Sequence, residues 1–203
     1  MDEENPRDSP DLKALAYAWR ARIDASEGKK VSASKHIDIA YGYAEYLKEK
    51  PWILARLEMM AGDVDLRDDS VDKYADKAFA HYTKAADYAE AYGGEGNGYQ
   101  INPRIGLALL EMPDEKDKQG QNMEKARRRF IQLIDNSHVP TGRLYGQYGM
   151  ALIALRENLT GDARRQLQQI QKEIRHSSRG NVLLKLAEKS YEKIIGAGNK
   201  FVD

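Results

Sequence analysis

The spacing of apolar residues between positions 71 and 92 is the feature that most constrains the fold of this 203-residue chain. Apolar side chains recur there every three or four residues, at Val71, Tyr74, Ala78, Tyr82, Ala85, Ala89 and Tyr92. This is the period of an α-helix, and it places all of these side chains on one helical face. The sequence contains no alternating β-branched run bounded by hairpin turns. It therefore predicts an all-α protein whose helices each bury one apolar face.

The same period, interrupted by prolines, glycines and capping residues, predicts nine helices. Ser9 and Asn102 each precede a proline, which is typical of the start of a helix, and Asp69 or Ser70 can cap the fourth helix. The expected ranges are 11–26, 32–49, 51–62, 70–92, 103–112, 121–135, 140–157, 161–176 and 179–195. We expect a disordered acidic tail at residues 1–10, one helical domain at 11–197 and a short tail at 198–203.

A short motif recurs in the second helix of each expected helix pair. A small residue is followed, four and seven positions later, by two further small or apolar residues that share its helical face. The four copies are Ala40, Ala44, Leu47; Ala78, Tyr82, Ala85; Ala126, Phe130, Leu133; and Ala163, Leu167, Ile170. Two first helices, PWILARLEMM (51–60) and PRIGLALLEM (103–112), also match after their prolines, which pairs Leu57 with Leu109. We interpret the chain as repeated helix pairs, and two unrelated amphipathic helices remain the alternative.

This pattern resembles the tetratricopeptide repeat family, whose units are helix-turn-helix pairs of about 34 residues. The resemblance covers about residues 12–195 and is clearest over residues 144–174. It implies a right-handed α-solenoid of about four helix pairs, closed by a capping helix near residues 181–195. The chain departs from the family pattern because most first helices lack the family's Trp and Gly, and because internal loops lengthen the two middle units.

No arrangement of residues in the sequence indicates catalysis or a bound cofactor. The segment DVDLRDDS lacks the glycine and the final glutamate of a calcium loop, and GGEGNG follows a helix rather than a strand. The chain has no cysteine and no Ser-His-acid pattern. The four histidines show no metal-binding spacing; they are His36, His81, His138 and His176. We therefore expect a non-enzymatic protein with no metal and no cofactor.

Charge is unevenly distributed along a chain whose net charge is zero. Residues 123–185 contain 12 basic and 5 acidic side chains, a surplus that could bind nucleic acid. The arginines of KARRRF alternate with core positions, however, as they do on an ordinary solvated helix face. No apolar run approaches the roughly 20 residues that span a bilayer, and the first residues do not resemble a secretory signal. A soluble protein of the cytoplasm is expected, or of the periplasm if a leader or lipid anchor has been removed.

The resemblance and the missing catalytic pattern together favour a scaffold or adaptor that binds a partner peptide or protein in its concave groove. We select Arg56 and Arg104 on two first helices, because arginine can bind a carboxylate through two parallel hydrogen bonds. Tyr145 and Tyr148 would add apolar contact area on another first helix. These residues favour a somewhat acidic peptide. A nucleic-acid-binding protein and a cell-envelope protein that handles a small ligand remain alternatives, as does a purely structural role for the four side chains.

Overall fold

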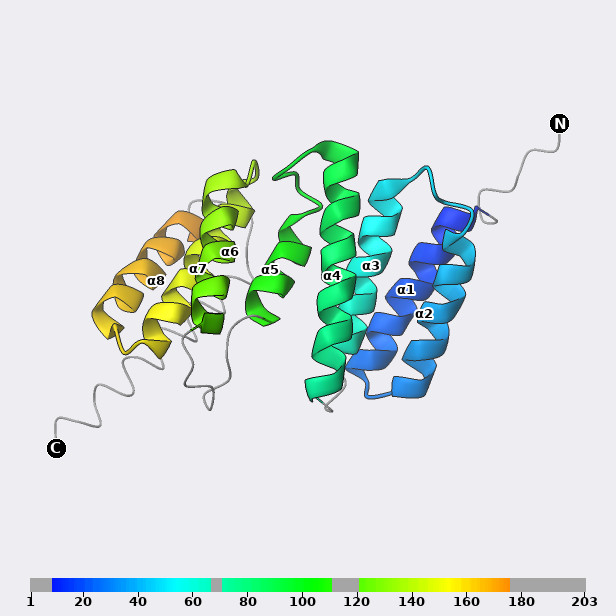
Figure 1. Cartoon of the computed structure of the whole chain (residues 1–203), viewed down its shortest axis with the longest axis horizontal. Coiled ribbons are helices and arrows are strands. Elements are labelled where there is room, and N and C mark those ends of the chain that lie inside the picture. The colour runs from blue at the N-terminus through cyan, green and yellow to red at the C-terminus, as the bar shows by residue number, and fades with distance from the viewer. Residues whose placement is uncertain (1–8, 67–70, 111–120, 176–203) are drawn as a thin grey trace. The chain divides into compact units, whose positions relative to one another are not determined.

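The computed structural model describes residues 9–66, 71–110 and 121–175 of the chain, and its secondary structure in these ranges consists of α-helices without strands (Figure 1). The prediction of an all-α protein is confirmed for this part of the chain. The expected ninth helix, most of the N-terminal tail, the C-terminal tail and the possible caps Asp69 and Ser70 lie outside the described residues. The helices are α1 (Pro10–Ser26), α2 (Lys30–Ala44), α3 (Pro51–Asp65), α4 (Val71–Gly93), α5 (Ile101–Leu110), α6 (Gln121–Asn136), α7 (Pro140–Arg156) and α8 (Thr160–Arg175).

Several helix ends differ from those predicted. Helix α2 ends at Ala44 rather than near residue 49, because turn hydrogen bonds replace the helical ones after it. Helix α5 begins at Ile101, so Pro103 lies inside its first turn, where a missing N–H costs no helical hydrogen bond. Ser9 does occupy the position before Pro10, but its side chain makes no capping hydrogen bond. The prolines therefore mark helix starts more reliably than the capping side chains do.

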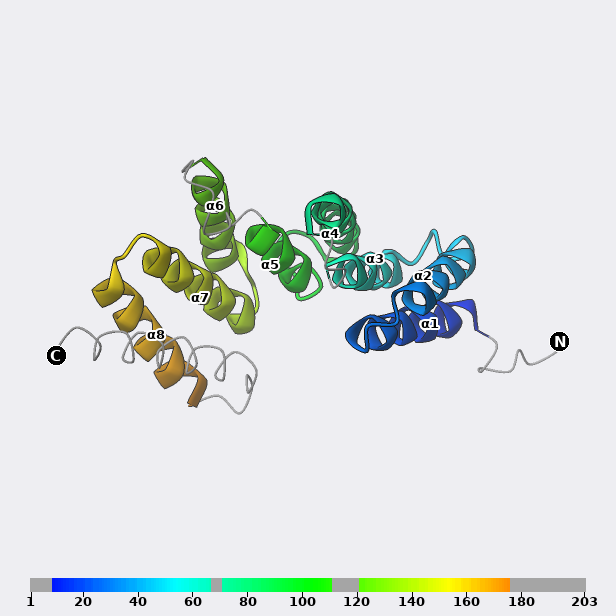
Figure 2. The ribbon, with the colours of Figure 1, turned by 90° about the horizontal axis from the view of Figure 1, so that it is seen from below.

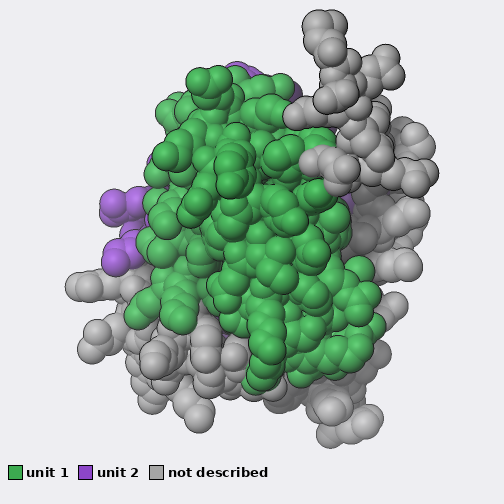
Figure 3. Space-filling model, turned by 90° about the vertical axis from the view of Figure 1, so that its right-hand side faces the viewer, with its two compact units in different colours: residues 1–110 green, residues 111–203 purple. Residues whose placement is uncertain are grey.

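The chain forms two compact units, residues 1–110 with α1–α5 and residues 111–203 with α6–α8 (Figure 3). In unit 1, α1 packs on α2 and α3 packs on α4, while α1 also contacts α3 and α4 contacts α5 (Figure 2). In unit 2, α7 packs against both α6 and α8. Helices that follow one another in the sequence are thus neighbours in space within each unit. No helix of the described residues has the length and apolar character that crossing a membrane would require.

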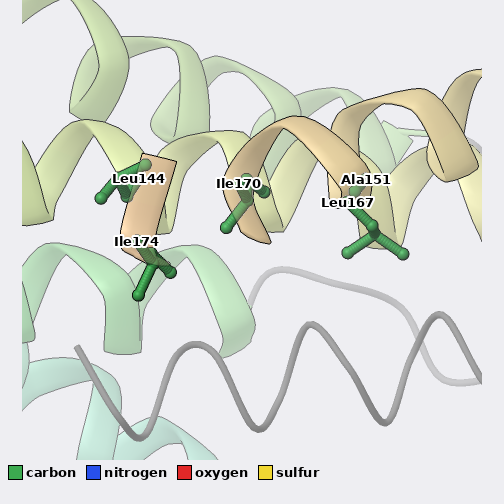
Figure 4. Close-up of a cluster of buried hydrophobic side chains, with 5 residues drawn as sticks. All are labelled: Leu144, Ala151, Leu167, Ile170 and Ile174. Carbon is green, nitrogen blue, oxygen red and sulfur yellow. The ribbon is translucent and has the colours of Figure 1, made fainter. Parts of the chain in front are cut away.

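Small side chains line the places where helices approach most closely. Ala14, Ala18 and Ala21 on α1 are completely buried, and every residue of the four motif copies is buried as well. In unit 2, larger side chains from α7 and α8 surround Ala151 and complete the core (Figure 4), namely Leu144, Leu167, Ile170 and Ile174. The predicted match between the two first helices fails at one pair, because Leu57 is fully buried and Leu109 is 46% exposed.

Glycines allow two aromatic residues of the motif to pack closely against neighbouring helices. A Cβ atom added to Gly62 would lie 2.8 Å from Cε1 of Tyr82, and one added to Gly106 would lie 2.6 Å from Cε2 of the same ring. In unit 2, a Cβ added to Gly149 would overlap the ring of Phe130 still more severely. Glycine is therefore required on the facing helix where each ring makes contact. A Cβ atom there would come much closer to the ring than van der Waals contact allows.

Candidate interaction surface

Helix α1 presents three large apolar side chains to solvent. Leu12, Trp19 and Ile23 are 55%, 46% and 47% exposed. They are spaced by seven and then four residues, so they lie along the side of the helix opposite its buried alanines. Large apolar side chains are normally buried in a soluble protein, and several on one helix face mark a surface that contacts another molecule.

A second set of side chains runs along α3. Trp52, Arg56, Met59 and Asp63 are separated by four, three and four residues, which places them on one face of the helix. Arg56 is exposed and the other three are half-buried. This face is distinct from the one that carries Ile53, which is buried in the helix interfaces.

Arg22 joins these two faces. Its guanidinium lies 5.0 Å from the ring centroid of Trp19, and its Nε atom is 2.9 Å from Oδ2 of Asp63. The other carboxylate oxygen of Asp63 accepts a hydrogen bond of 2.8 Å from the Tyr82 hydroxyl. Arg22 therefore fixes the side of α1 that bears Trp19 beside the exposed side of α3. We call this surface the α1–α3 face and define it by Leu12, Trp19, Ile23, Trp52, Arg56 and Met59.

One arginine gives the α1–α3 face positive charge. Arg56 is exposed on α3, where it belongs to this face. Arg20 lies on another side of α1, because consecutive residues of a helix do not share a face, and it pairs at 3.3 Å with Asp24, which is bound to Ser32 and His36 of α2. Within the described residues, Arg56 forms no ion pair that would neutralise it. The face thus combines apolar area with positive charge.

The four residues selected from the sequence lie in different surroundings. Arg56 belongs to the α1–α3 face, whereas Arg104 on α5 is largely covered and forms an ion pair of 3.4 Å with Glu95. Tyr145 and Tyr148 belong to unit 2 and pack against the buried cluster of α7 and α8. Burial also raises the pKa of the Tyr145 hydroxyl. The structure thus places the two arginines in unit 1 and gives both tyrosines a packing role.

The sequence analysis missed the apolar part of the α1–α3 face. A usable signal was present, because Leu12, Trp19 and Ile23 fall off the stripe formed by Ala14, Ala18 and Ala21. Large apolar residues on the polar side of an otherwise regular helix are unexplained by the core, so they indicate an exposed contact surface.

A polar network is buried nearby, where α2, α3 and α4 meet. Glu58 is 6% exposed, and its Oε2 atom lies 2.6 Å from Nδ1 of His81 and accepts a hydrogen bond of 3.0 Å from Tyr41. The other ring nitrogen of His81, Nε2, is 3.5 Å from Asp65. Burial, reinforced by the negative charge of Glu58, raises the pKa of the Tyr41 hydroxyl far above its usual value. Glu58 is therefore satisfied by neighbours on two other helices, which fixes their relative positions.

A related arrangement joins α1 and α2. The carboxylate of Asp24 is completely buried and accepts a hydrogen bond of 2.6 Å from Ser32, while His36 Nδ1 lies 2.8 Å from the same oxygen. The hydrogen bond from Ser32, followed by that from His36, lowers the pKa of Asp24 although burial opposes this shift. Because Asp24 holds both groups, the arrangement is that of a structural cluster rather than of a nucleophile and its base.

In unit 2 several basic residues of α6 and α8 pair with carboxylates. Arg127 pairs with Glu157 and Arg165 with Asp162, and Arg128 lies 3.5 Å from Glu124. These pairs reduce the charge available for binding phosphates, so the geometry gives the basic surface no particular support as a nucleic-acid site.

The chain matches no family model, no curated protein and no solved structure. Within the described residues, no group of three or more His, Asp or Glu side chains is placed to hold a metal ion. The α1–α3 face, with its exposed apolar side chains and Arg56, is therefore the best candidate for a functional surface in the described part of the chain.

Proposed function

We propose that this protein is a non-enzymatic interaction module, built from tetratricopeptide-like helix pairs, that binds a segment of a partner protein on its α1–α3 face. The repeated motif supports the helix-pair interpretation, because its residues are buried and the helices that carry it pack against their neighbours in sequence. A row of such pairs would provide an elongated surface for a peptide without any catalytic group.

The exposure of Trp19 between Leu12 and Ile23 is the observation that carries the proposal. Tryptophan and arginine are the side chains that contribute most often to the energy of protein interfaces, and here Trp19 lies under the guanidinium of Arg22. Arg22 is itself held by Asp63, so the tryptophan ring is oriented before any partner binds. An anchor oriented in advance loses less conformational entropy on binding.

The chemistry of the face defines the partner segment. Its apolar centre requires one or more large apolar side chains, and the exposed guanidinium group of Arg56 favours a carboxylate beside them. The expected ligand is therefore an acidic peptide with an apolar anchor. This is the partner class that Arg56, Arg104, Tyr145 and Tyr148 together indicated from the sequence, here with a binding surface made by α1 and α3.

Selection of peptides from a random library against the full chain tests the proposal. The enriched sequences should combine acidic and large apolar residues, and their affinity can be measured by fluorescence anisotropy. Trp19→Ser should weaken binding by about tenfold or more, which is typical of the loss of an interface hot spot. Arg56→Ala should weaken it less and should reduce its dependence on salt.

The matched control is Lys84→Ala, which removes an exposed charge from α4, outside the α1–α3 face. Its affinity should equal that of the unaltered protein, and circular dichroism should show that all variants are equally helical. The proposal is wrong if selection yields no binding peptides, or if Trp19→Ser binds the selected peptides as tightly as the control does.

A further inference from the structure

Helix α2 of unit 1 presents one side to solvent over most of its length. Its other side packs against α1 and α3, where Ile37 and three alanines are buried. Val31, Lys35, Asp38 and Gly42 are all exposed. They are separated by four, three and four residues, so they form a continuous row along one face of the helix. We call this row the α2 face.

Large apolar side chains belong to this exposed side of α2. Val31 is 72% exposed, while Ile39, beside the row, and Tyr46, just after the end of the helix, are 41% and 78% exposed. A single apolar residue on a surface needs no explanation, whereas several gathered on one side of a helix indicate a surface that contacts another molecule.

Gly42 leaves a gap among the side chains of the α2 face. It lies inside the helix, where glycine is less favourable than alanine. A Cβ atom added to Gly42 would meet nothing within 4 Å, so packing within the chain does not require a glycine there. A glycine on an exposed helix face does, however, allow the backbone or side chain of another molecule to approach closely.

The two charged residues of the α2 face have opposite signs. Lys35 and Asp38 are three residues apart, yet within the described residues neither forms an ion pair with the other or with a third side chain. A lysine that precedes its acidic partner is the weaker order for pairing along one helix. Both charges are therefore available to a second molecule.

The α2 face is symmetric in its arrangement. Lys35 and Asp38 lie at equal sequence distances from a point midway between residues 36 and 37, and Val31 and Gly42 lie at equal distances further out. Two copies of α2 that run antiparallel around a two-fold axis at this point bring Lys35 opposite Asp38 and Val31 opposite Gly42, each pair twice. The face is thus complementary to itself in both charge and shape.

From this self-complementarity we infer that the α2 face is a dimerisation surface on which a second copy of this chain docks with its own α2 antiparallel. Val31 of each copy packs into the space left by Gly42 of the other, and Lys35 of each copy pairs with Asp38 of the other. The helix has 15 residues and is about 22 Å long, so the contact is small and the dimer is weak and concentration-dependent. The α2 face shares no residue with the α1–α3 face, and the inference does not depend on the peptide-binding proposal.

Sedimentation equilibrium of the full chain tests the inference over protein concentrations from about 5 to 500 µM, a range that brackets weak dissociation constants. The unaltered protein should change from monomer to dimer within it. Lys35→Glu and Asp38→Lys each place like charges at both contacts, so each should weaken association by about tenfold or more. Lys84→Glu makes the same change in net charge at an exposed position of α4 and should leave association unchanged.

Combining the two charge reversals separates a contact between copies from a loss of folding. Mixing the Lys35→Glu and Asp38→Lys proteins restores opposite charges at both contacts, so heterodimers should form from two variants that are each largely monomeric. The double variant, which carries both reversals in one chain, should dimerise with itself for the same reason. Circular dichroism should show the same helix content in every variant.

Gly42→Leu tests the complementarity of shape. An added Cβ meets nothing within 4 Å in its own chain, so the variant should remain folded. The leucine side chain would occupy the space into which Val31 of the second copy packs, and it should weaken association by about tenfold or more.

The inference is overturned if the chain is monomeric at every concentration, or if Lys35→Glu and Gly42→Leu associate as strongly as the unaltered protein. It is also overturned if the two charge variants form no heterodimer on mixing. Trp19→Ser should dimerise normally, and Gly42→Leu should bind the selected peptides normally, so a failure of this inference can be distinguished from a failure of the peptide-binding proposal.

Discussion

Similar positions in the two units carry different polar groups. In unit 1, His36 and His81 each lie three residues after a buried alanine of a second helix, and each is held by a buried carboxylate. In unit 2, Gln166 lies three residues after the buried Ala163 and lines a cavity together with Gln147. The alanine is retained, while the polar position changes from a histidine–carboxylate pair to uncharged amides.

This difference separates two requirements of a helix pair. Close approach depends on small side chains at the contact, and both units meet this requirement with alanine and glycine. The polar position beside the contact can carry different chemistry in each pair: the carboxylates of unit 1 are bonded to histidines, whereas the buried oxygens of Gln147 and Gln166 in unit 2 accept no hydrogen bond. Among the described residues, the buried carboxylates Asp24 and Glu58 both belong to unit 1, so that unit should be the more sensitive to acid.

The largest loss of stability is expected when a charged side chain replaces one of the buried alanines at which helices make contact in both units. Ala126→Arg in α6 would bury an unpaired guanidinium at a position that is now completely buried, and it should destabilise unit 2 by about 3–5 kcal/mol. Far-ultraviolet circular dichroism during urea unfolding measures this loss. Both tryptophans, Trp19 and Trp52, lie in unit 1, so their fluorescence reports on that unit separately. Unchanged stability would remove Ala126 from the core.

Replacing a glycine at a helix contact should cause the next largest loss of stability, and the size of the loss should differ between positions. Gly62→Ala and Gly149→Ala force a methyl group against the rings of Tyr82 and Phe130, which should cost about 1–3 kcal/mol of stability. Gly149→Ala should cost more, because its added Cβ would lie closer to the ring.

Gly42→Ala is the matched control for these two variants, because its added Cβ would meet nothing within 4 Å. It should stabilise the protein by roughly 0.5–1 kcal/mol, since alanine is the better helix former. Urea midpoints that fall equally for all three variants would contradict the contact argument.

The histidine–carboxylate pair of Glu58 and His81 in unit 1 can be replaced by two amides, the uncharged groups that unit 2 carries at Gln147 and Gln166. Glu58→Gln or His81→Gln alone leaves a buried partner without its usual neighbour and should cost about 1–3 kcal/mol. The double variant, with both changes, should lose less than the sum of the two single variants, because two amides can hydrogen-bond to each other. A double-mutant cycle from urea unfolding measures this coupling, and strictly additive losses would show that the two side chains do not act as a pair.

The smallest loss of stability is expected when the pH is lowered, and it is expected only in unit 1. The pKa of Asp24 in the folded protein is below its ordinary value of 3.8, so its contribution to stability is fully present above that value. It is lost as the pH falls through 3.8 towards the lower pKa of the folded state, because only the unfolded chain gains the proton readily in this range. Tryptophan fluorescence during urea unfolding should therefore show a steeper loss of stability in this range for the unaltered protein than for Asp24→Asn.

Ser32→Ala is the second variant for this comparison. Removing the hydroxyl takes away the hydrogen bond that lowers the pKa of Asp24 most, so the acid sensitivity should decrease without disappearing. An acid response that is identical in Ser32→Ala and in the unaltered protein would show that another group is responsible.

The sequence by itself determined the helices and much of the core. The period of three to four residues identified the buried side of α4, and the motif identified alanines that are buried in every copy. These features depend only on residues that are close together in the chain. The geometry of a helix places residues three or four positions apart on the same face. Even so, the register between α3 and α5 was wrong at Leu57 and Leu109, because the burial of a helix face depends on what packs against it.

Only the tertiary structure decided which polar and aromatic groups meet. Nothing in the spacing of Glu58 and His81, or of Arg22 and Asp63, indicates that these side chains touch. The same holds for the candidate surface. Arg56 was selected from the sequence, whereas Trp19 is linked to α3 only through the contact of Arg22 with Asp63. Contacts between helices depend on distances in space that sequence separation does not encode.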